Sequence, residues 1–167
     1  MKNTFLPLII LIFLSFVAKS QDKLGIHVGI VQPIVTFSSN GTSSLVDNYA
    51  LGFPVGITYR LSDKLAFDAE FVPFVNSAGQ ASLLVHPGML FGLGSGFTLG
   101  TRAAFDVGQS SFGFTPLINK GFPISDNNKL FLELVLPLRF VTQYDGLQGQ
   151  NIMNPQLSIG LHVGITF

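Results

Sequence analysis

The chain has 167 residues, a length that fits one domain, and it contains no cysteine. Charged residues make up 11% of it, against about 25% in an ordinary soluble domain, and nine basic residues balance nine acidic ones. The composition therefore argues against a nucleic-acid-binding protein, and the missing cysteines exclude disulfides, cysteine-linked lipid anchors and thiolate metal sites.

Residues 1–20 have the pattern of a cleaved signal peptide. Lys2 supplies the positive start, an apolar stretch runs from Phe5 to Val17, and small residues, Ala18 and Ser20, flank the cleavage site. The alternative is a retained anchor helix, but the apolar stretch is shorter than the roughly 20 residues that a spanning helix needs. We therefore expect an exported domain made of residues 21–167.

The exported domain divides into eight segments in which apolar and polar residues alternate, the period of a β-strand. Each has about the length that a tilted membrane strand needs. The predicted strands are 24–36, 48–61, 65–75, 81–92, 97–107, 112–124, 129–141 and 155–167. Tight turns follow the even strands, whereas the two longest connectors, 38–47 and 142–154, follow odd ones. Outer-membrane barrels place short turns in the periplasm and longer loops outside.

The alternation collects charges and glycines on one face and large apolar side chains on the other. In the seventh segment, for example, Leu132, Leu134 and Leu136 oppose Glu133 and Arg139. A soluble barrel of the lipocalin type would have its apolar face inside and its charges outside. In an exported chain of alternating strands, we interpret the apolar face as the lipid-facing one. The prediction is an all-β, eight-stranded, antiparallel up-and-down transmembrane barrel.

The signal, the eight strands and the C-terminal aromatic residue resemble the small outer-membrane barrels of the OmpA/OmpX type. In that family the barrel-insertion machinery reads the last strand, and Leu161, Val163, Ile165 and Phe167 match the pattern in kind. The resemblance implies a porin-like protein surrounded by the lipid of a Gram-negative outer membrane.

Two features depart from this family. The chain has no tryptophan, so tyrosines and phenylalanines must form the aromatic girdle. Seven prolines also fall inside the predicted strands, where each removes a hydrogen-bond donor from the ladder. These prolines, at positions 33, 54, 73, 87, 116, 123 and 137, predict bulges or strand ends.

Seven charged residues face inward by the same alternation, namely Arg60, Asp68, Glu70, Arg102, Asp106, Glu133 and Arg139. The interior of an eight-stranded barrel is just wide enough for side chains to fill it. Buried charges need partners, so we expect a charge network that plugs the lumen. Arg60 and Asp68 flank the turn at Asp63 and are expected to lie near each other. A narrow conducting path is the alternative.

Three histidines, His27, His86 and His162, face inward as well, and polar filling of the lumen is their expected role. No two of them have the close spacing of a metal-binding pair, so neither a metal nor a cofactor site is predicted. Ser158 and His162 share a face but lie about 13 Å apart along a strand. No catalytic residue is predicted, and the chain is not expected to be an enzyme.

The leading functional hypothesis is a structural, envelope or surface-interaction role. Loops 38–47 and 142–154 would then offer the surface for an extracellular ligand, because variable function resides on loops over a rigid scaffold. A pore through the lumen is the second hypothesis, and a lipid-modifying barrel enzyme is the third.

Overall fold

The computed structural model describes residues 23–47, 49–107, 111–145 and 150–167. The strands in these residues are β1 Leu24–Ser38, β2 Gly41–Ser44, β3 Ala50–Gly52, β4 Val55–Arg60, β5 Leu65–Asn76, β6 Ala81–Gly94, β7 Phe97–Asp106, β8 Ser111–Pro123, β9 Lys129–Val135, β10 Leu138–Asp145 and β11 Gln150–Thr166. Within these residues there is no helix with the length and apolar character to cross a membrane. The predicted signal peptide, residues 1–20, lies outside them.

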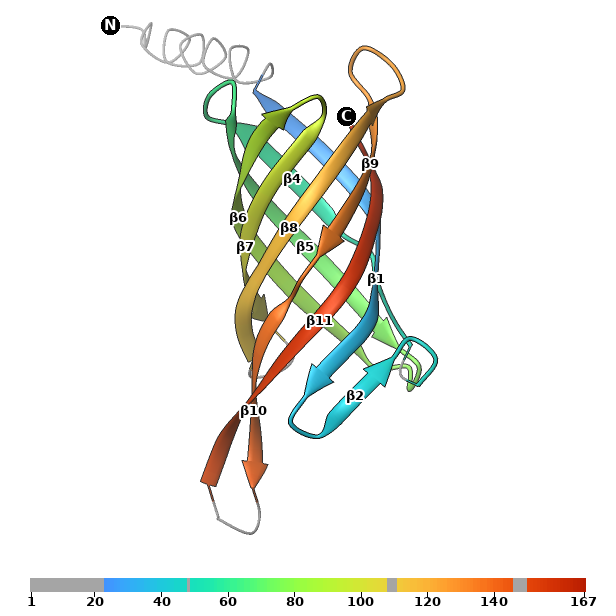
Figure 1. Cartoon of the computed structure of the whole chain (residues 1–167), viewed down its shortest axis with the longest axis vertical. Coiled ribbons are helices and arrows are strands. Elements are labelled where there is room, and N and C mark those ends of the chain that lie inside the picture. The colour runs from blue at the N-terminus through green and yellow to red at the C-terminus, as the bar shows by residue number, and fades with distance from the viewer. Residues whose placement is uncertain (1–22, 48, 108–110, 146–149) are drawn as a thin grey trace, which may run out of the picture.

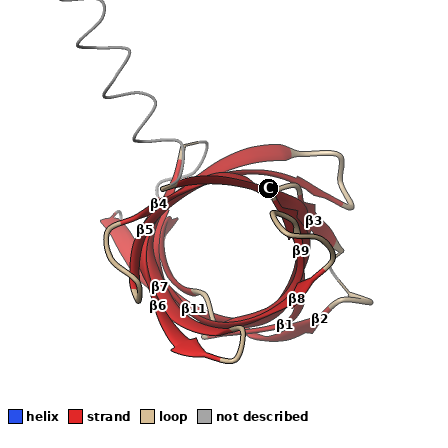
Figure 2. Cartoon of the chain, turned by 90° about the horizontal axis from the view of Figure 1, so that it is seen from above, coloured by secondary structure: helices blue, strands red, loops and turns tan. Residues whose placement is uncertain are grey.

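The strands form one antiparallel sheet that closes into a barrel (Figures 1 and 2). Strands at successive positions in the wall pair with each other, and β11 pairs with β1 from His27↔Thr166 to Ser38↔Gln156 to close the ring. The short strands β3 and β4 together occupy one position in the wall, and β9 and β10 occupy another. The wall therefore has eight positions, and the predicted architecture is confirmed.

A proline interrupts each of the two divided strands. Between β3 and β4, the Phe53 N–H donates to the carbonyl oxygen of Pro73 at 2.9 Å, and the carbonyl oxygen of Pro54 accepts from the Gly29 N–H at 3.0 Å. The break between β9 and β10 is built in the same way, with Leu136 donating to Pro116 at 2.9 Å and Pro137 accepting from Ser158 at 2.8 Å. Backbone hydrogen bonds thus continue across both breaks, as a strand in lipid requires.

The other prolines follow two patterns. Pro33 lies at an irregularity in the β1–β11 register, and Pro123 is the last residue of β8. Pro73, Pro87 and Pro116 instead lie within paired strands. The prediction of bulges or strand ends is therefore right for four of the seven positions and wrong for these three.

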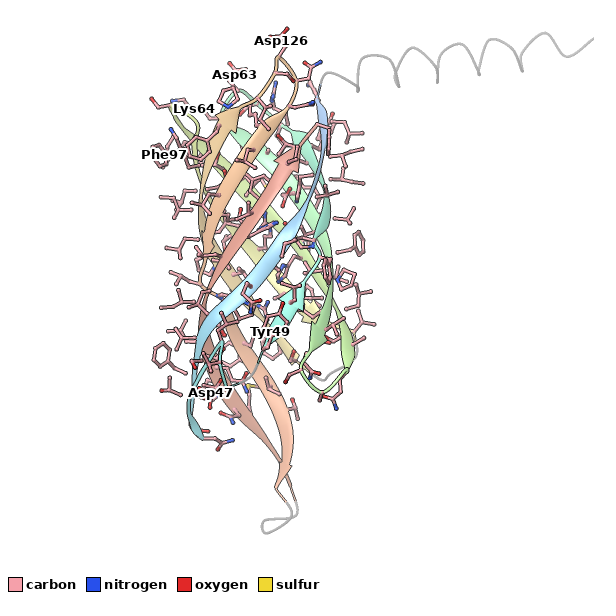
Figure 3. All side chains as sticks on the ribbon, turned by 90° about the vertical axis from the view of Figure 1, so that its right-hand side faces the viewer. Asp47, Tyr49, Asp63, Lys64, Phe97 and Asp126 are labelled. Atoms are coloured by element: carbon pink, nitrogen blue, oxygen red, sulfur yellow. The ribbon has the colours of Figure 1, made fainter. Side chains whose placement is uncertain are left out.

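Large apolar side chains cover the outside of the barrel (Figure 3). Their exposure alternates with burial along each strand, as in β9, where Leu130, Leu132 and Leu134 are exposed and Phe131 and Glu133 are buried. The surface agrees with the lipid-facing assignment. Lys120, a cation on this face, extends its Nζ to the carbonyl oxygen of Ser95 and lies 4.2 Å from the centre of the Phe97 ring. Long basic side chains reach the membrane boundary in this way.

The two ends of the barrel differ. Asp63, Lys64 and Asp126 lie at the end with the tight turns, and Asp47 and Tyr49 lie toward the other end (Figure 3). Ser95 and its neighbours Gly94 and Gly96 all have positive φ, which lets the β6–β7 turn reverse within a few residues. We call the first end the periplasmic end and the second the outer end, following the rule of short periplasmic turns.

The two long connectors contain strands rather than irregular loops. In segment 38–47, β2 pairs with the end of β1 to make an outer hairpin, residues 35–44. In segment 142–154, β10 and β11 stay paired from Thr142↔Met153 to Asp145↔Gln150, beyond the last residue of β10 that pairs with β8, Val141. We call residues 142–145 and 150–153 the outer ribbon, which projects from the barrel (Figure 1). The expectation of irregular loops here is wrong. Strands outside the membrane do not need an apolar face, so their sequences lack the alternation of apolar and polar residues that predicts a membrane strand.

Replacement of Leu134 by arginine should test the assignment of faces. The side chain of Leu134 is on the outer face of β9, and a cation at the middle of the bilayer costs about 2–4 kcal/mol. Ile124 at the periplasmic rim is the matched control, where the same replacement should cost about 0–1 kcal/mol. Free energies of unfolding from reversible refolding in lipid vesicles measure both. Equal costs at the two positions would contradict the placement of the bilayer.

Candidate functional site

A cluster of seven titratable side chains fills the periplasmic half of the lumen. Because side chains alternate between the two faces of a strand, the inward positions of six wall strands converge here. All are buried, with at most 6% of the residue exposed. The lumen cluster consists of His27 on β1, Asp68 and Glu70 on β5, His86 on β6, Arg102 on β7, Glu133 on β9 and His162 on β11.

Arg102 lies at the centre of the cluster and contacts all three carboxylates. Its Nε donates to Asp68 Oδ2 at 2.8 Å, and its Nη1 donates to Glu133 Oε1 at 2.8 Å. Its Nη2 lies 3.4 Å from Glu70 Oε1. A planar guanidinium with several fixed donors suits this task, since one side chain links three strands across the lumen.

Other donors complete the hydrogen bonding of the carboxylates. Thr58 Oγ1 donates to Asp68 Oδ1 at 2.6 Å, and Asn119 Nδ2 donates to Glu133 Oε2 at 3.3 Å. His27 Nε2 lies 3.0 Å from Glu70 Oε1. An ionised carboxylate only accepts hydrogen bonds, so each such donor lowers the cost of burying its charge.

The other two histidines face the cluster differently. His162 Nδ1 lies 3.2 Å from Glu133 Oε1 and 3.7 Å from Glu70 Oε1. His86 Nε2 lies 2.9 Å from Arg139 Nη2, and because a guanidinium only donates, this nitrogen accepts and the ring proton is on Nδ1. His86 Nδ1 has no hydrogen-bond partner within the described part of the chain and lies 3.5 Å from Glu70 Oε2.

Two glycines make space for the largest members of the cluster. Gly56 is opposite His27 in the β1–β4 register, and Gly88 is opposite Arg102 in the β6–β7 register. A Cβ on Gly56 would overlap with two atoms of the His27 imidazole ring, and a Cβ on Gly88 would lie 2.6 Å from Arg102 Cγ. The glycines on the inner face therefore have a steric role, because each admits a bulky polar side chain.

Toward the outer end, the lumen becomes apolar. Val72, Leu84 and Ala104 are buried and pack with Val31 and Phe74. A cavity of about 40 Å³, room for a few water molecules, separates this apolar layer from the lumen cluster. Its polar lining comes from the cluster, through Glu70, His86, Arg102, Glu133 and His162, and from Thr115, Arg139 and Ser158.

The predicted network is only partly what the structure contains. Arg60, the last residue of β4, is exposed at the barrel mouth, and Thr58 rather than Arg60 is opposite Asp68. The expected Arg60–Asp68 pair is therefore wrong, because Asp68 binds Arg102 and Thr58 instead. The alternation places Arg60 inward, but its position at the strand end leaves it in water.

Arg139 and Asp106 lie outside the central cluster. Arg139 donates to Thr115 Oγ1 at 3.1 Å and to His86, and it interacts electrostatically with Asp106. Thr58, Thr115 and Asn119 were not among the predicted site residues. All three are inward by the same alternation, and a count of polar as well as charged inward positions would have found them.

Comparisons with solved structures show the fold of small outer-membrane barrels. Neisserial surface protein A is 16% identical, with a TM-score of 0.51, and the alignment covers 84% of this chain and 96% of that one. The outer membrane protein OprG from Pseudomonas aeruginosa is 9% identical with a TM-score of 0.42, covering 86% and 94%. A designed transmembrane barrel is 15% identical with a TM-score of 0.40, covering 84% and 94%.

No protein-family model and no curated protein matches the chain. The similarity is therefore one of architecture. The chain has the fold of an outer-membrane β-barrel, as the sequence predicted, and this fold belongs in the outer membrane of a Gram-negative bacterium.

Removal of the central cation should destabilise the barrel strongly. Arg102→Met leaves three carboxylates buried without their shared partner, and breaking a buried ion pair typically costs about 3–5 kcal/mol. Arg60→Met is the matched control and should change stability little, since Arg60 is exposed. Reversible urea unfolding in lipid vesicles compares the two. A loss for Arg102→Met no larger than that for Arg60→Met would contradict the central role of this cation.

Proposed function

We propose that the chain is an integral outer-membrane barrel with a closed lumen, and that it acts through the structure that it holds at the outer end. The observation that carries this proposal is the lumen cluster, which spans the barrel interior from β1, β5 and β6 to β7, β9 and β11. A barrel filled in this way serves as an anchor in the membrane.

The closed lumen rests on packing as well as on charge. Arg102 is 3% exposed and contacts three carboxylates, so an ion passing along the axis would have to break several buried contacts. The apolar layer around Val72 and Leu84 adds a second obstruction toward the outer end. Breaking a buried ion pair costs several kcal/mol, which opposes frequent opening.

The outer hairpin and the outer ribbon supply the surface available for interaction. The ribbon is an antiparallel pair whose backbone continues the barrel strands β10 and β11, so the rigid wall fixes its direction. β2 pairs with β1 in the described sheet and is at the end of the strand order. Such a strand edge can accept another strand. We propose a surface-interaction or envelope role for these two elements.

A narrow pore is the second candidate, and the cavity beside Arg102 supports it. Water in this cavity would adjoin Glu70, Glu133 and Arg139, so a rearrangement of the Arg102 side chain would extend the wet region. The enzymatic alternative has less support. Ser158 Oγ is 2.8 Å from Thr36 Oγ1, and His162 Nδ1 faces Glu133, so neither side chain activates the other.

Purified wild-type protein in a planar bilayer should show little or no steady conductance. Arg102→Ala should raise the frequency of small openings, because the carboxylates lose the group that holds them across the lumen. Arg60→Ala is the control and should behave like the wild type. A large, constant, ion-selective current from the wild type would refute the closed lumen and favour the pore.

Shortening the outer ribbon should separate anchoring from function. A variant in which a short turn replaces residues 142–153 should still fold, because Leu138–Val141 keep their pairs with β8. In a deletion strain, wild type should restore resistance to detergents and exclusion of a hydrophobic dye, and the shortened variant should not. Full restoration by the shortened variant, at equal amounts of folded barrel, would contradict the role of the ribbon.

A further inference from the structure

Glu70, Glu133 and His162 hold three ligand atoms at the edge of the interior cavity, all within 4.8 Å of one another. His162 Nδ1 lies 3.2 Å from Glu133 Oε1 and 3.7 Å from Glu70 Oε1. Ligand atoms of a tetrahedral zinc ion with bonds of about 2.1 Å are about 3.4 Å apart. The His162–Glu133 separation is slightly below this value, and the His162–Glu70 separation is slightly above it.

Charge favours a cation at this position. Asp68, Glu70 and Glu133 carry three negative charges, and Arg102 supplies one positive charge to all three. With neutral imidazoles the group has two negative charges in excess. One divalent cation balances this excess, and two protons on His27 and His162 would balance it as well. Protons would keep these contacts as hydrogen bonds, whereas the cation would be bound by Glu70, Glu133 and His162 together.

We propose that Glu70, Glu133 and His162 form a binding site for a divalent transition-metal cation of the zinc class. One imidazole nitrogen and two carboxylate oxygens suit zinc better than calcium or magnesium, which take more oxygen ligands. The adjacent cavity leaves space for a water molecule as the fourth ligand.

The surrounding groups are placed to support metal-bound carboxylates. Arg102 Nη1 donates to Glu133 Oε1 at 2.8 Å, and Asn119 donates to Glu133 Oε2. His86 is 6% exposed, and its Nδ1, which makes no hydrogen bond within the described residues, lies 3.5 Å from Glu70 Oε2. This nitrogen can orient the Glu70 carboxylate, whose other oxygen, Oε1, faces His162 Nδ1 at 3.7 Å. Metal sites commonly have such outer hydrogen bonds to their ligands.

A second triad, His27, Asp68 and Glu70, has similar spacing but suits a metal less well. Its two shortest contacts to the imidazole use different nitrogens of His27, Nδ1 to Asp68 Oδ1 at 3.8 Å and Nε2 to Glu70 Oε1 at 3.0 Å, whereas Glu70 and Glu133 both face Nδ1 of His162. His27 and Asp68 are also not among the residues that line the cavity, which Glu70, Glu133 and His162 all do. The two triads differ in their histidine, and this difference allows a direct test.

The test uses the refolded barrel in detergent, treated with chelator and then titrated with ZnCl₂. Wild type should bind one zinc ion per chain, by elemental analysis after gel filtration, with an increase in Tm. Co²⁺ in place of zinc should give the visible absorption of a tetrahedral site. His162→Gln should weaken zinc binding by more than the roughly 10- to 100-fold typical of lost outer partners. His27→Gln, the matched control, should keep the bound zinc and the cobalt spectrum.

Three results would overturn the proposal: no zinc retained by the wild type, equal retention by His162→Gln and wild type, or loss in His27→Gln alone. Nitrogen NMR of histidine-labelled wild type provides a measurement that does not depend on folding of the variants. Zinc should shift the imidazole resonances of His162 far more than those of His27. A shift confined to His27 would place the metal at the second triad instead. Failure of zinc binding would leave the closed lumen, tested by conductance, unaffected.

Discussion

The structure depends on one guanidinium held inside a closed ring of strands. A barrel with eight wall positions has no space for a solvated charge at its centre, so Arg102 must meet its counter-charges directly. It contacts carboxylates from β5 and β9, which lie on opposite sides of β7 in the order of the wall. Each contact therefore also fixes the distance across the lumen.

Other inner positions are adapted to this arrangement. Gly88 opposite Arg102 and Gly56 opposite His27 have no side chain because one would overlap with the cluster. Thr58 and Asn119 supply the hydrogen bonds that Arg102 leaves unmade. Phe131 lies edge-on to His162, with ring centres 4.8 Å apart, and fills the remaining space beneath the cluster. The lumen is thus a packed polar core, and the outer surface is the apolar part of the molecule.

Alternation along the chain was sufficient to predict the fold. It also predicted that apolar side chains lie on the outer surface and charged ones in the lumen. A period of two determines which residues share a face, and His27, His86 and His162, inward by this rule, are buried in the structure. It does not specify how far along the axis each residue lies. Arg60 was assigned to the network for this reason, although the end of β4 places it in water.

Contacts between distant strands could not be predicted from alternation. The partners of Arg102 depend on the relative shift of strands around the ring, which the turns and the two proline breaks set together. The approach of His162 to Glu70 and Glu133 arises in the same way, because β11 meets β9 directly but faces β5 only across the lumen. Its ligand geometry was therefore invisible in the spacing of histidines along the chain.

The outer end shows a different limit of sequence reasoning. Strands outside the membrane have no lipid on either face, so no alternation separates them from a loop. The outer ribbon is recognisable only from its pairing, Thr142↔Met153 and beyond.

A double-mutant cycle on Arg102 and Glu133 tests the central claim most directly. Free energies of unfolding in lipid vesicles are needed for wild type, Arg102→Met, Glu133→Gln and the double variant. If the pair holds the lumen together, each single variant should be strongly destabilised, and the double variant should be more stable than the sum of the two losses predicts by about 1–3 kcal/mol. Strictly additive losses would contradict the account, because they would mean that the two side chains contribute to stability independently.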